Sequence, residues 1–302
     1  MQIEYLMVKN FRNLAQQKIE FGEKLNVLYG KNAQGKTNTL EAIYLSTIGR
    51  SPRTRKDSEM IAFKESSLET VLGYNHKGAK HQIEINITPR LKQISVDKNK
   101  LTRIADIIGN FGSVYFSPDE LKLVQGSPAN RRRFLDIILC QLSKKYLTDL
   151  KNFQKVLNQR NSLLKLGDET QIEVWNESLA IYAEKLFVAR EKFFENIKQN
   201  ILNMHLSLTS GQEELSLQYE SALTGSESLI KDYLAGLSKS LERDKVLGYT
   251  TFGLQNDDFS VISSGLDLRK NGSQGQQRTA TLSLKLAELE ILKEEYGEYP
   301  VL

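Results

Sequence analysis

The sequence has few of the residues that build disulfides and metal centres. Among 302 residues there are one cysteine and three histidines. A single thiol cannot form a disulfide within the chain, and Cys140 falls in an apolar helical pattern, which predicts a buried small side chain rather than a nucleophile or a ligand. The histidines have no metal-type spacing, so we expect them to be surface or packing residues. These scarcities argue against a disulfide-stapled domain and a structural metal cluster.

Long apolar runs are absent as well. No stretch approaches the ~20 apolar residues that a membrane-spanning helix needs, and residues 1–5 lack the basic-then-apolar layout of a signal peptide. We therefore expect no membrane partner and a cytoplasmic location. With 40% hydrophobic residues the chain can still bury a sizeable core, in one discontinuous or two continuous domains.

Charge is nearly balanced over the chain but unevenly placed. The 41 basic and 37 acidic residues leave a net charge of +4. Residues 121–165 hold ten basic residues against Asp136 and Asp149, a local charge of +8, so the remainder sums to −4. Such asymmetry favours a polyanionic partner. The alternative is a solvated helix face that happens to be basic.

What the sequence does contain is a phosphate-binding loop. The segment Gly-Lys-Asn-Ala-Gln-Gly-Lys-Thr fits the pattern G-x-x-x-x-G-K-[ST]. The apolar residues 24–29 predict a strand before it, and Lys36 to about Thr47 predict a helix that ends at Gly49. A glycine-rich turn with an incidental lysine is the alternative. The residues predicted to hold the nucleotide are Gly30, Lys31, Asn32, Ala33, Gln34, Gly35, Lys36 and Thr37.

The chemistry of this loop depends on its backbone. Two glycines let successive N–H groups face inward, and the positive end of the following helix adds to the cradle for an anion. Lys36 would pair with the β- and γ-phosphates of ATP, and the Thr37 hydroxyl would ligate Mg²⁺.

Periodicity predicts the other elements. The expected elements are strands at residues 3–9 and 17–21, a hairpin over 68–88, a strand at 93–96, one long amphipathic helix from Ser127 through Leu157, a second helix from Ile172 to about Ile197 or Met204, a strand at 214–219, a helix over 227–244 and a strand at 257–262. The two long helices are expected to be antiparallel.

Two basic segments are candidate contacts for the phosphates of a polyanionic partner such as DNA. The residues are Arg53, Arg55 and Lys56 in the loop after the nucleotide helix, and Arg131, Arg132, Arg133, Lys144 and Lys145 in the basic helical segment. We expect them to meet phosphates without reading bases. For the arginine triplet at 131–133, pairing with carboxylates inside the protein is the alternative.

A second motif lies near the end of the chain. Ser273-Gln274-Gly275-Gln276-Gln277 opens a helical pattern, with Ser273 at the position of an N-cap. Alone this pattern is weak, because serine and glycine are common at helix starts. Together with the phosphate loop it resembles the signature motif of an ABC-type ATPase.

Four motifs in order resemble the RecF family of bacterial recombination mediators. They are Asn-Phe-Arg-Asn-Leu at 10–14, the phosphate loop at 30–38, Phe-Ser-Pro-Asp at 116–119 with 126–128 and 131–136, and Gly-Ser-Gln-Gly-Gln-Gln-Arg-Thr at 272–279. The resemblance implies an α/β fold, an ABC-type (Rad50-like) P-loop ATPase head with a helical second lobe. The expected division is 1–120 and 246–302 for the head and 121–245 for the lobe.

The resemblance also implies a function. Arg12 and Asn13 would lie beside the nucleotide, and the signature serine and glycine would meet the γ-phosphate bound by a second subunit. The protein would use ATP and Mg²⁺ to dimerise on DNA at junctions of single and double strands. With RecR and RecO it would help load the recombinase RecA onto gaps coated by single-strand-binding protein, in DNA replication, recombinational repair and the SOS response. Its ATPase activity would be weak and stimulated by DNA.

The sequence departs from the family pattern at its end. Family members continue after Leu302 into an apolar strand ending in the acidic pair that holds Mg²⁺ and positions water. We therefore expect the residues for hydrolysis to lie outside this sequence, and we assign no catalytic residue within it. A fragment unable to hydrolyse ATP is one alternative.

Other protein classes share parts of the pattern. A transporter ATPase subunit would lack the sheet-rich insertion at 68–96 and the basic helix, and a P-loop kinase would lack the segment at 273–277. A scaffold that binds no nucleotide would have little use for Lys36 and Thr37. Rad50 and SMC proteins have the same type of head but need more residues for a long coiled coil.

Overall fold

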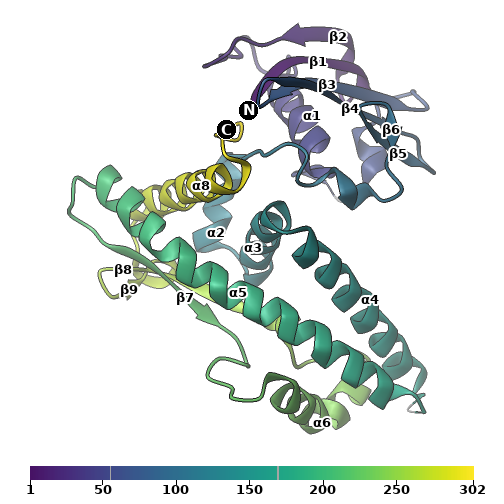
Figure 1. Cartoon of the computed structure of the whole chain (residues 1–302), viewed down its shortest axis with the longest axis vertical. Helices are drawn as coiled ribbons and strands as arrows, with labels where there is room; N and C mark the ends of the chain where they lie inside the picture. The colour runs from purple at the N-terminus through teal and green to yellow at the C-terminus, as the bar shows by residue number, and fades with distance from the viewer. Residues whose placement is uncertain (55, 169) are drawn as a thin grey trace. The chain divides into compact units, whose positions relative to one another are not determined.

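The computed structural model describes all residues except 55 and 169. The chain forms two compact units, which we call the sheet unit (residues 1–115 and 292–302) and the helical unit (residues 116–291). Figure 1 labels their helices and strands.

The sheet unit contains an antiparallel sheet with the strand order β2-β1-β3-β4-β5-β6. Its strands are β1 (Gln2–Phe11), β2 (Leu14–Glu20), β3 (Leu68–His76), β4 (Ala79–Ile87), β5 (Lys92–Val96) and β6 (Asn99–Lys100). Ile83, Ile85 and Ile87 alternate along β4 and are fully buried, as the period of two predicts. The turn between β3 and β4 has positive φ at Lys77 (50°) and Gly78 (82°), the geometry of a two-residue hairpin. The expected strands at 3–9, 17–21 and 93–96 and the hairpin are confirmed.

Helix α1 (Lys36–Ile48) follows the phosphate loop and packs on the sheet. Its C-cap Gly49 has φ 75° and donates its N–H to the carbonyl of Leu45, the left-handed stop that the sequence predicted. Short 3-10 turns, η1 (Asp57–Met60) and η2 (Ile104–Ile107), complete this unit.

The prediction of a strand before the phosphate loop is wrong. Residues 24–29 belong to no strand, and Leu25, Val27 and Tyr29 are 85%, 69% and 92% exposed. An apolar run becomes a strand only where a neighbouring strand satisfies its backbone and covers its side chains, and no described strand pairs with it. The segment has no regular secondary structure, and two hydrogen bonds between Gly22 and Asn26 hold its start.

The helical unit combines long helices with a three-stranded sheet of order β7-β8-β9. Its elements are η3 (Pro118–Leu121), α2 (Lys122–Gln125), α3 (Pro128–Leu142), α4 (Lys144–Leu166), α5 (Ile172–Leu208), β7 (Leu215–Glu220), α6 (Leu229–Leu247), η4 (Leu254–Asn256), β8 (Asp258–Ser263), β9 (Leu266–Asp267), α7 (Leu268–Asn271) and α8 (Gln274–Tyr296), whose last turn lies in the sheet unit. Helices α4 and α5 pack antiparallel and α6 packs against both (Figure 1).

The single helix expected from Ser127 through Leu157 is two helices. Ser143 is extended (φ −147°, ψ 111°) and separates α3 from α4. Its side-chain hydroxyl accepts a hydrogen bond from the backbone N–H of Tyr146 at 3.1 Å. The apolar period continues across this break, so periodicity alone could not reveal it, whereas serine is a favoured N-cap because it satisfies such a free N–H group.

The C-terminal boundary of the lobe also differs from the expectation. Residues 246–291 belong to the helical unit rather than to the head. Strand β8 pairs antiparallel with β7, from Leu215 opposite Ser263 to Glu220 opposite Asp258. Only residues 292–302 join the sheet unit, where the N–H of Val114 donates to the carbonyl of Val301 at 2.8 Å. Strand pairing, which links residues distant in sequence, sets this boundary.

Arg160 joins three helices of the helical unit. It is fully buried in α4, and its guanidinium donates to Asn176 in α5 (2.7 Å), Asp244 in α6 (2.8 Å) and the hydroxyl of Thr250 (2.7 Å). A buried charge is tolerated only with a partner of opposite sign. The Arg160–Asp244 pair therefore fixes α4 against α6.

Arg190 plays a similar part in α5. It donates to Asp136 of α3 at 3.0 Å, to Asp257 before β8 at 2.9 Å and to the hydroxyl of Tyr146 at 3.1 Å. Its side chain is 3% exposed. The guanidinium thus ties α3, α4 and the start of β8 to one point on α5.

Candidate nucleotide-binding site and signature segment

The phosphate loop has the backbone that an anion cradle requires. Gly30, Ala33 and Gly35 have positive φ values of 141°, 66° and 91°. At Gly35 a Cβ would lie 2.3 Å from Cδ2 of Leu14, so both the backbone angle and the space select glycine there. The loop leads into α1, whose N-terminal N–H groups add partial positive charge. The residues from Gly30 to Gln34 are exposed, so the cradle opens to solvent.

Lys36 and Thr37 occupy the first turn of α1. The Lys36 ammonium lies 2.8 Å from the carbonyl oxygen of Gly30 and 2.7 Å from that of Lys31. These two bonds place the charge against the loop backbone, within reach of an anion bound there. Thr37 is exposed beside it, and among the described residues its hydroxyl has no hydrogen-bond partner. These residues therefore fit a nucleoside triphosphate, and the Thr37 hydroxyl is suited to ligate Mg²⁺.

Arg12 and Asn13 lie at the end of β1 and connect to this loop. The side-chain amide of Asn13 donates to the carbonyl of Ala33 at 2.7 Å. Arg12 is bidentate with Glu41 of α1, through Nε (3.0 Å) and Nη2 (2.7 Å). Arg12 has positive φ (56°), so the chain turns here toward the loop. The structure brings Asn13 to the loop directly and Arg12 to the helix that follows it.

The signature segment begins α8 with a reciprocal cap. The Ser273 hydroxyl accepts from the N–H of Gln276 at 3.2 Å, and the Gln276 side chain accepts from the N–H of Ser273 at 3.0 Å. This is a capping box, in which each side chain satisfies a free backbone donor. Gly275 lies in the first turn, where a Cβ would meet only the Ser273 hydroxyl, at 3.8 Å. The expected N-cap role of Ser273 is confirmed.

The last glutamine of the segment faces inward. Gln277 is 7% exposed, donates to the carbonyl of Leu268 at 2.8 Å and accepts from the Gln125 side chain at 2.6 Å. Gln276 also donates to Glu213 at 3.1 Å. Ser273, Gln274 and Gly275 thus remain at the surface, while the two later glutamines anchor the helix start.

The DNA assignment of Arg131 is wrong. Arg131 is 2% exposed and bidentate with Asp258, at 2.6 Å from Nε and 2.8 Å from Nη2. The nearby Arg131 charge holds the pKa of Asp258 low, although burial alone would raise that pKa. A buried side chain that is paired with a carboxylate in this way cannot contact a DNA phosphate. The structural alternative is therefore correct for this residue.

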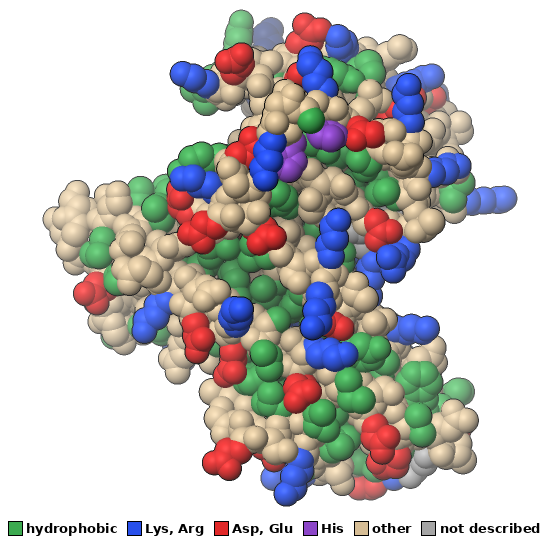
Figure 2. Space-filling model, viewed as in Figure 1, with side chains coloured by type: hydrophobic (Ala, Val, Ile, Leu, Met, Phe, Trp, Pro, Cys, Tyr) green, Lys and Arg blue, Asp and Glu red, His purple; other side chains and the backbone are tan. Residues whose placement is uncertain are grey.

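The other candidate DNA residues divide by exposure. Arg132 is half-buried and donates to the carbonyl of Asp257 at 2.7 Å. The exposed ones are Arg53, Lys56, Arg133, Lys144 and Lys145, and Arg55 lies outside the described residues. Figure 2 shows Lys and Arg interspersed with Asp and Glu on the face that it draws, without one continuous basic stripe there.

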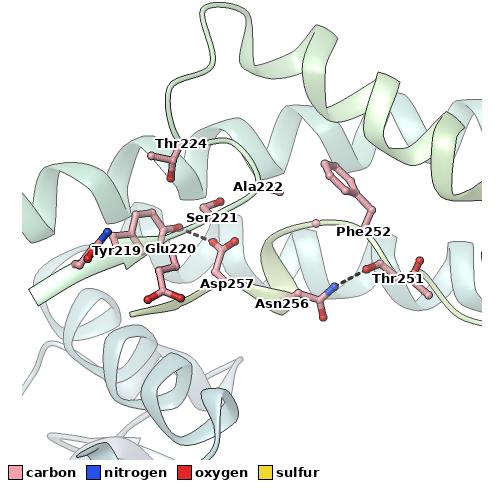
Figure 3. A pocket seen from close by; sticks show the side chains of 11 residues that line it. Tyr219, Glu220, Ser221, Ala222, Thr224, Thr251, Phe252, Asn256 and Asp257 are labelled. Atoms are coloured by element: carbon pink, nitrogen blue, oxygen red, sulfur yellow. Dashed lines mark hydrogen bonds between the residues drawn. The ribbon is translucent and has the colours of Figure 1, made fainter. Parts of the chain in front are cut away.

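A separate hollow lies in the helical unit, with a volume of about 490 Å³. Figure 3 shows the Tyr219 hydroxyl directed at the carboxylate of Asp257, which also accepts from Arg190. Burial raises the pKa of Asp257, and the Arg190 charge opposes that rise. The Tyr219 hydroxyl and the Arg190 guanidinium thus both donate to the carboxylate that lines this hollow.

Cys140 and His205 are packing residues. Cys140 is buried, and His205 is fully buried with its Nδ1 2.8 Å from the Ser283 hydroxyl. His76 and His81 are partly exposed. Glu41 was not predicted from the sequence as a residue of this site. One signal was available, because Glu41 is a charged residue on the same buried face of α1 as the core residues Ala42 and Leu45.

No helix in the described part of the chain is both long and apolar enough to cross a membrane.

Comparisons with known proteins agree along nearly the whole chain. A protein-family model described as an AAA domain matches residues 5–295. The chain is 39% identical over 306 residues to the DNA replication and repair protein RecF of Lachnoclostridium phytofermentans, and 40% identical over 310 residues to the protein of that name from Clostridium tetani. These alignments cover 99% and 100% of this chain, and 84% of each relative.

Comparison with solved structures agrees with the sequence comparisons. A structure described as the recombination mediator protein RecF-ATP in the RecFOR pathway matches with a TM-score of 0.95 and 36% identity, over 100% of this chain and 83% of that chain. A RecF-ATPrS structure matches with a TM-score of 0.92 and 35% identity, over 99% and 83%. An SmcHead bound to a domain of ScpA matches at 0.54 with 16% identity, over 96% and 77%, which shows a shared fold alone. The expected α/β ATPase head with a helical second lobe is confirmed.

Proposed function

The chain belongs to the RecF family of DNA replication and repair proteins, and from that premise we propose that it binds ATP with Mg²⁺ and, in that state, dimerises on DNA. The site would be the phosphate loop at residues 30–37, with Arg12 and Asn13 beside it. The DNA would be a junction of single and double strands. With RecR and RecO, the bound dimer would help load the recombinase onto gapped DNA.

The phosphate loop is the observation that carries this proposal. Its glycines have the φ values of an inward-facing cradle, and Lys36 is hydrogen-bonded to the loop backbone. The relatives solved with ATP and ATPrS share this fold at 36% and 35% identity. When bound, Mg²⁺ would neutralise phosphate charge. Thr37 would hold the ion, and Lys36 would pair with the terminal phosphates.

The signature segment supports the dimer. Ser273 and Gly275 are exposed at the N-terminus of α8, a helix of 23 residues, where a hydroxyl and free N–H groups favour a negatively charged group. In the proposed dimer this surface meets the γ-phosphate held by the partner's loop. Dimerisation then depends on that phosphate.

Removing the Lys36 charge tests nucleotide binding. Lys36→Ala should lower ATP affinity ~10- to 100-fold, because a charge-assisted pair contributes roughly 1.5–3 kcal/mol. The measurement is titration with a fluorescent ATP analogue in Mg²⁺, with urea unfolding to confirm equal stability. Equal affinities would remove the loop from the proposal.

Two substitutions at Ser273 separate a phosphate contact from a helix cap. Asp and Asn both cap helices about as well as Ser, so Ser273→Asp and Ser273→Asn should preserve the start of α8. Only Asp adds a negative charge where the partner's γ-phosphate would lie. Sedimentation in ADP, ATP and a slowly hydrolysed analogue should show an ATP-dependent dimer for wild type and Ser273→Asn and a monomer for Ser273→Asp. A Ser273→Asp protein that dimerises like wild type would mean that the segment is only a cap.

A further inference from the structure

Phe63 is the most exposed phenylalanine of the chain. It is 89% exposed, whereas Phe116, the next of the twelve phenylalanines, is 47% exposed. Burial of a large aromatic ring stabilises a fold, and a ring left in water contributes none of that stabilisation. A single exposed apolar side chain is common in itself, so a role for this ring depends on how it is held and on what lies beside it.

The ring lies on a turn that is bonded to the end of β1. The N–H of Ala62 donates to the carbonyl of Asn10 at 2.9 Å, and the N–H of Glu65 donates to the carbonyl of Ala62 at 3.0 Å. The side-chain amide of Asn10 also donates to the Glu65 carboxylate at 3.0 Å. Phe63 and Lys64 are therefore the two central residues of a hydrogen-bonded turn, and both ends of that turn are bonded to Asn10. A fixed backbone thus presents the ring to solvent.

Lys64 adds a cation and an uncommon backbone angle to this turn. Its φ is 70°, in the left-handed region that favours glycine. Its ammonium lies 5.6 Å from the centroid of the Phe63 ring, which is within cation–π distance. Lys64 is itself exposed. An aromatic surface and a positive charge therefore lie side by side on this turn.

The chain that leads to this turn is basic. Residues 50–65 hold five Lys and Arg against three Asp and Glu, a formal charge of +2. Proteins that bind single-stranded nucleic acid combine a positive surface, which attracts the phosphates, with aromatic side chains on which bases stack. The turn supplies the aromatic component at the end of a segment that supplies the charge.

We propose that Phe63 is a base-stacking residue for single-stranded DNA, on whose ring one unpaired base stacks while Lys64 meets a neighbouring phosphate. The inference rests on the proposed function, because it assumes that the protein binds DNA at a junction of single and double strands. It adds a means of recognising the junction. Phosphates are present on both sides of a junction, whereas in a duplex the faces of the bases are covered by their neighbours. Only the unpaired side therefore offers a base to the ring.

The adenine of a bound nucleotide is the rival occupant, because Asn10 is followed by Arg12 and Asn13 beside the phosphate loop. A nucleotide site is concave and encloses most of its ligand, whereas the Phe63 ring lies on a turn and is 89% exposed. An unpaired base that stacks on its own neighbours needs only one further surface. The exposure of the ring therefore favours DNA.

The test compares Phe63→Ala, Phe63→Trp and Lys64→Gly with a Leu91→Ala control. Leu91 is another exposed apolar residue of the sheet unit, between β4 and β5, at 55% exposure. The DNA probes, used at saturating ATP and Mg²⁺, are a duplex with a single-stranded extension and a closed circular duplex, which has no unpaired base. The unpaired positions next to the junction carry 2-aminopurine, a base whose fluorescence reports stacking. Affinity for a fluorescent ATP analogue is measured in parallel, and urea unfolding checks that each variant is folded.

Stacking predicts a selective loss of affinity. Phe63→Ala should bind the duplex with the extension roughly 5- to 150-fold more weakly, the equivalent of about 1–3 kcal/mol for one stacked base, and should bind the closed circular duplex as wild type does. Phe63→Trp should keep both the affinity and the 2-aminopurine signal, because tryptophan also offers an aromatic face.

The lysine variant separates the charge from the ring. Glycine suits the φ of 70° at this position, so Lys64→Gly should keep the turn. It should lower the slope of log K against log salt by about 0.7, the value for one phosphate on a single strand. Phe63→Ala should leave that slope unchanged, because the ring carries no charge. ATP affinity should equal that of wild type in every variant.

Three results overturn the inference. Phe63→Ala that matches Leu91→Ala on the extended duplex means that no base stacks on the ring. Equal losses on both DNA probes mean that the ring does not recognise unpaired bases. A loss of ATP affinity in Phe63→Ala, with DNA affinity unchanged, assigns the ring to the adenine instead. A wild-type protein that binds neither DNA probe would overturn the proposed function itself, so the two failures are distinguishable.

Discussion

Arginines in the two units have opposite surroundings. In the sheet unit, Arg12 and Arg53 share one carboxylate and remain 21% and 43% exposed. In the helical unit, the side chains of Arg131, Arg160 and Arg190 are 3%, 0% and 3% exposed, and each has a carboxylate partner of its own. The first pair keeps cationic charge available at the surface, whereas the second group uses its charge inside the fold.

The difference shows that local charge in a sequence does not locate a binding face. Residues 121–165 carry +8 by formal count, yet two of the cations, Arg131 and Arg160, are neutralised in the interior by Asp258 and Asp244. Both carboxylates lie outside that segment. Arg12 and Arg53, which share the carboxylate of Glu41, remain partly exposed instead.

Breaking the Arg160 pair should give the largest effect. Arg160→Met leaves Asp244 as a buried, uncompensated charge, so the free energy of unfolding should fall by about 3–5 kcal/mol. Urea unfolding followed by the fluorescence of Trp175, the single tryptophan, measures this in the helical unit. Adding Asp244→Asn removes the stranded charge and should restore much of the loss. A change below about 1 kcal/mol for Arg160→Met alone would contradict the structural role.

Exposed and buried cations of the helical unit should differ in DNA binding. Lys144→Gln with Lys145→Gln removes two exposed charges, so the slope of log K against log salt should fall by about 1.4–1.8 with stability unchanged. The matched control is Arg131→Met with Asp258→Asn, which removes a buried pair. It should lower stability and leave the slope alone. Equal slopes for the lysine variant and the wild type would exclude this end of α4 from the DNA contact.

The smallest predicted effect is a pH dependence from His205. Burial lowers the pKa of His205 below its ordinary value of 6.5, and the charge of Glu213 opposes this only in part. The unfolded chain therefore binds the proton more tightly, so the stability from neutral His205 is present above pH 6.5 and is lost as pH falls below it.

The measurement is the free energy of unfolding from pH 7.5 to 5 for the wild type and for His205→Gln, which can keep the hydrogen bond to Ser283. The variant should lose stability less steeply with acid. Taking the difference between the two proteins cancels the opposite contribution of Asp257 and Glu288, whose pKa values burial raises. Parallel curves would mean that His205 does not titrate in this range. Glu41, whose pKa its arginine and Ser51 partners hold low against the effect of burial, is common to both proteins and cancels in the same way.

The sequence by itself determined the features that depend on neighbouring residues. The phosphate loop, the stop of α1 at Gly49, the two-residue hairpin at Lys77 and Gly78 and the cap at Ser273 all follow from backbone preferences over a few positions. For the same reason strand β4 was predictable, since Ile83, Ile85 and Ile87 are buried and alternate with less buried residues.

Only the tertiary structure decided which charges are buried and which elements belong together. Arg131 and Arg132 are adjacent in sequence, yet Arg131 is buried and paired with Asp258, whereas Arg132 is half-buried. The reason is that α3 directs Arg131 toward β8. Residues 24–29 have the composition of a strand but no described strand beside them. Burial and strand pairing depend on residues distant in sequence, so composition and periodicity cannot determine them.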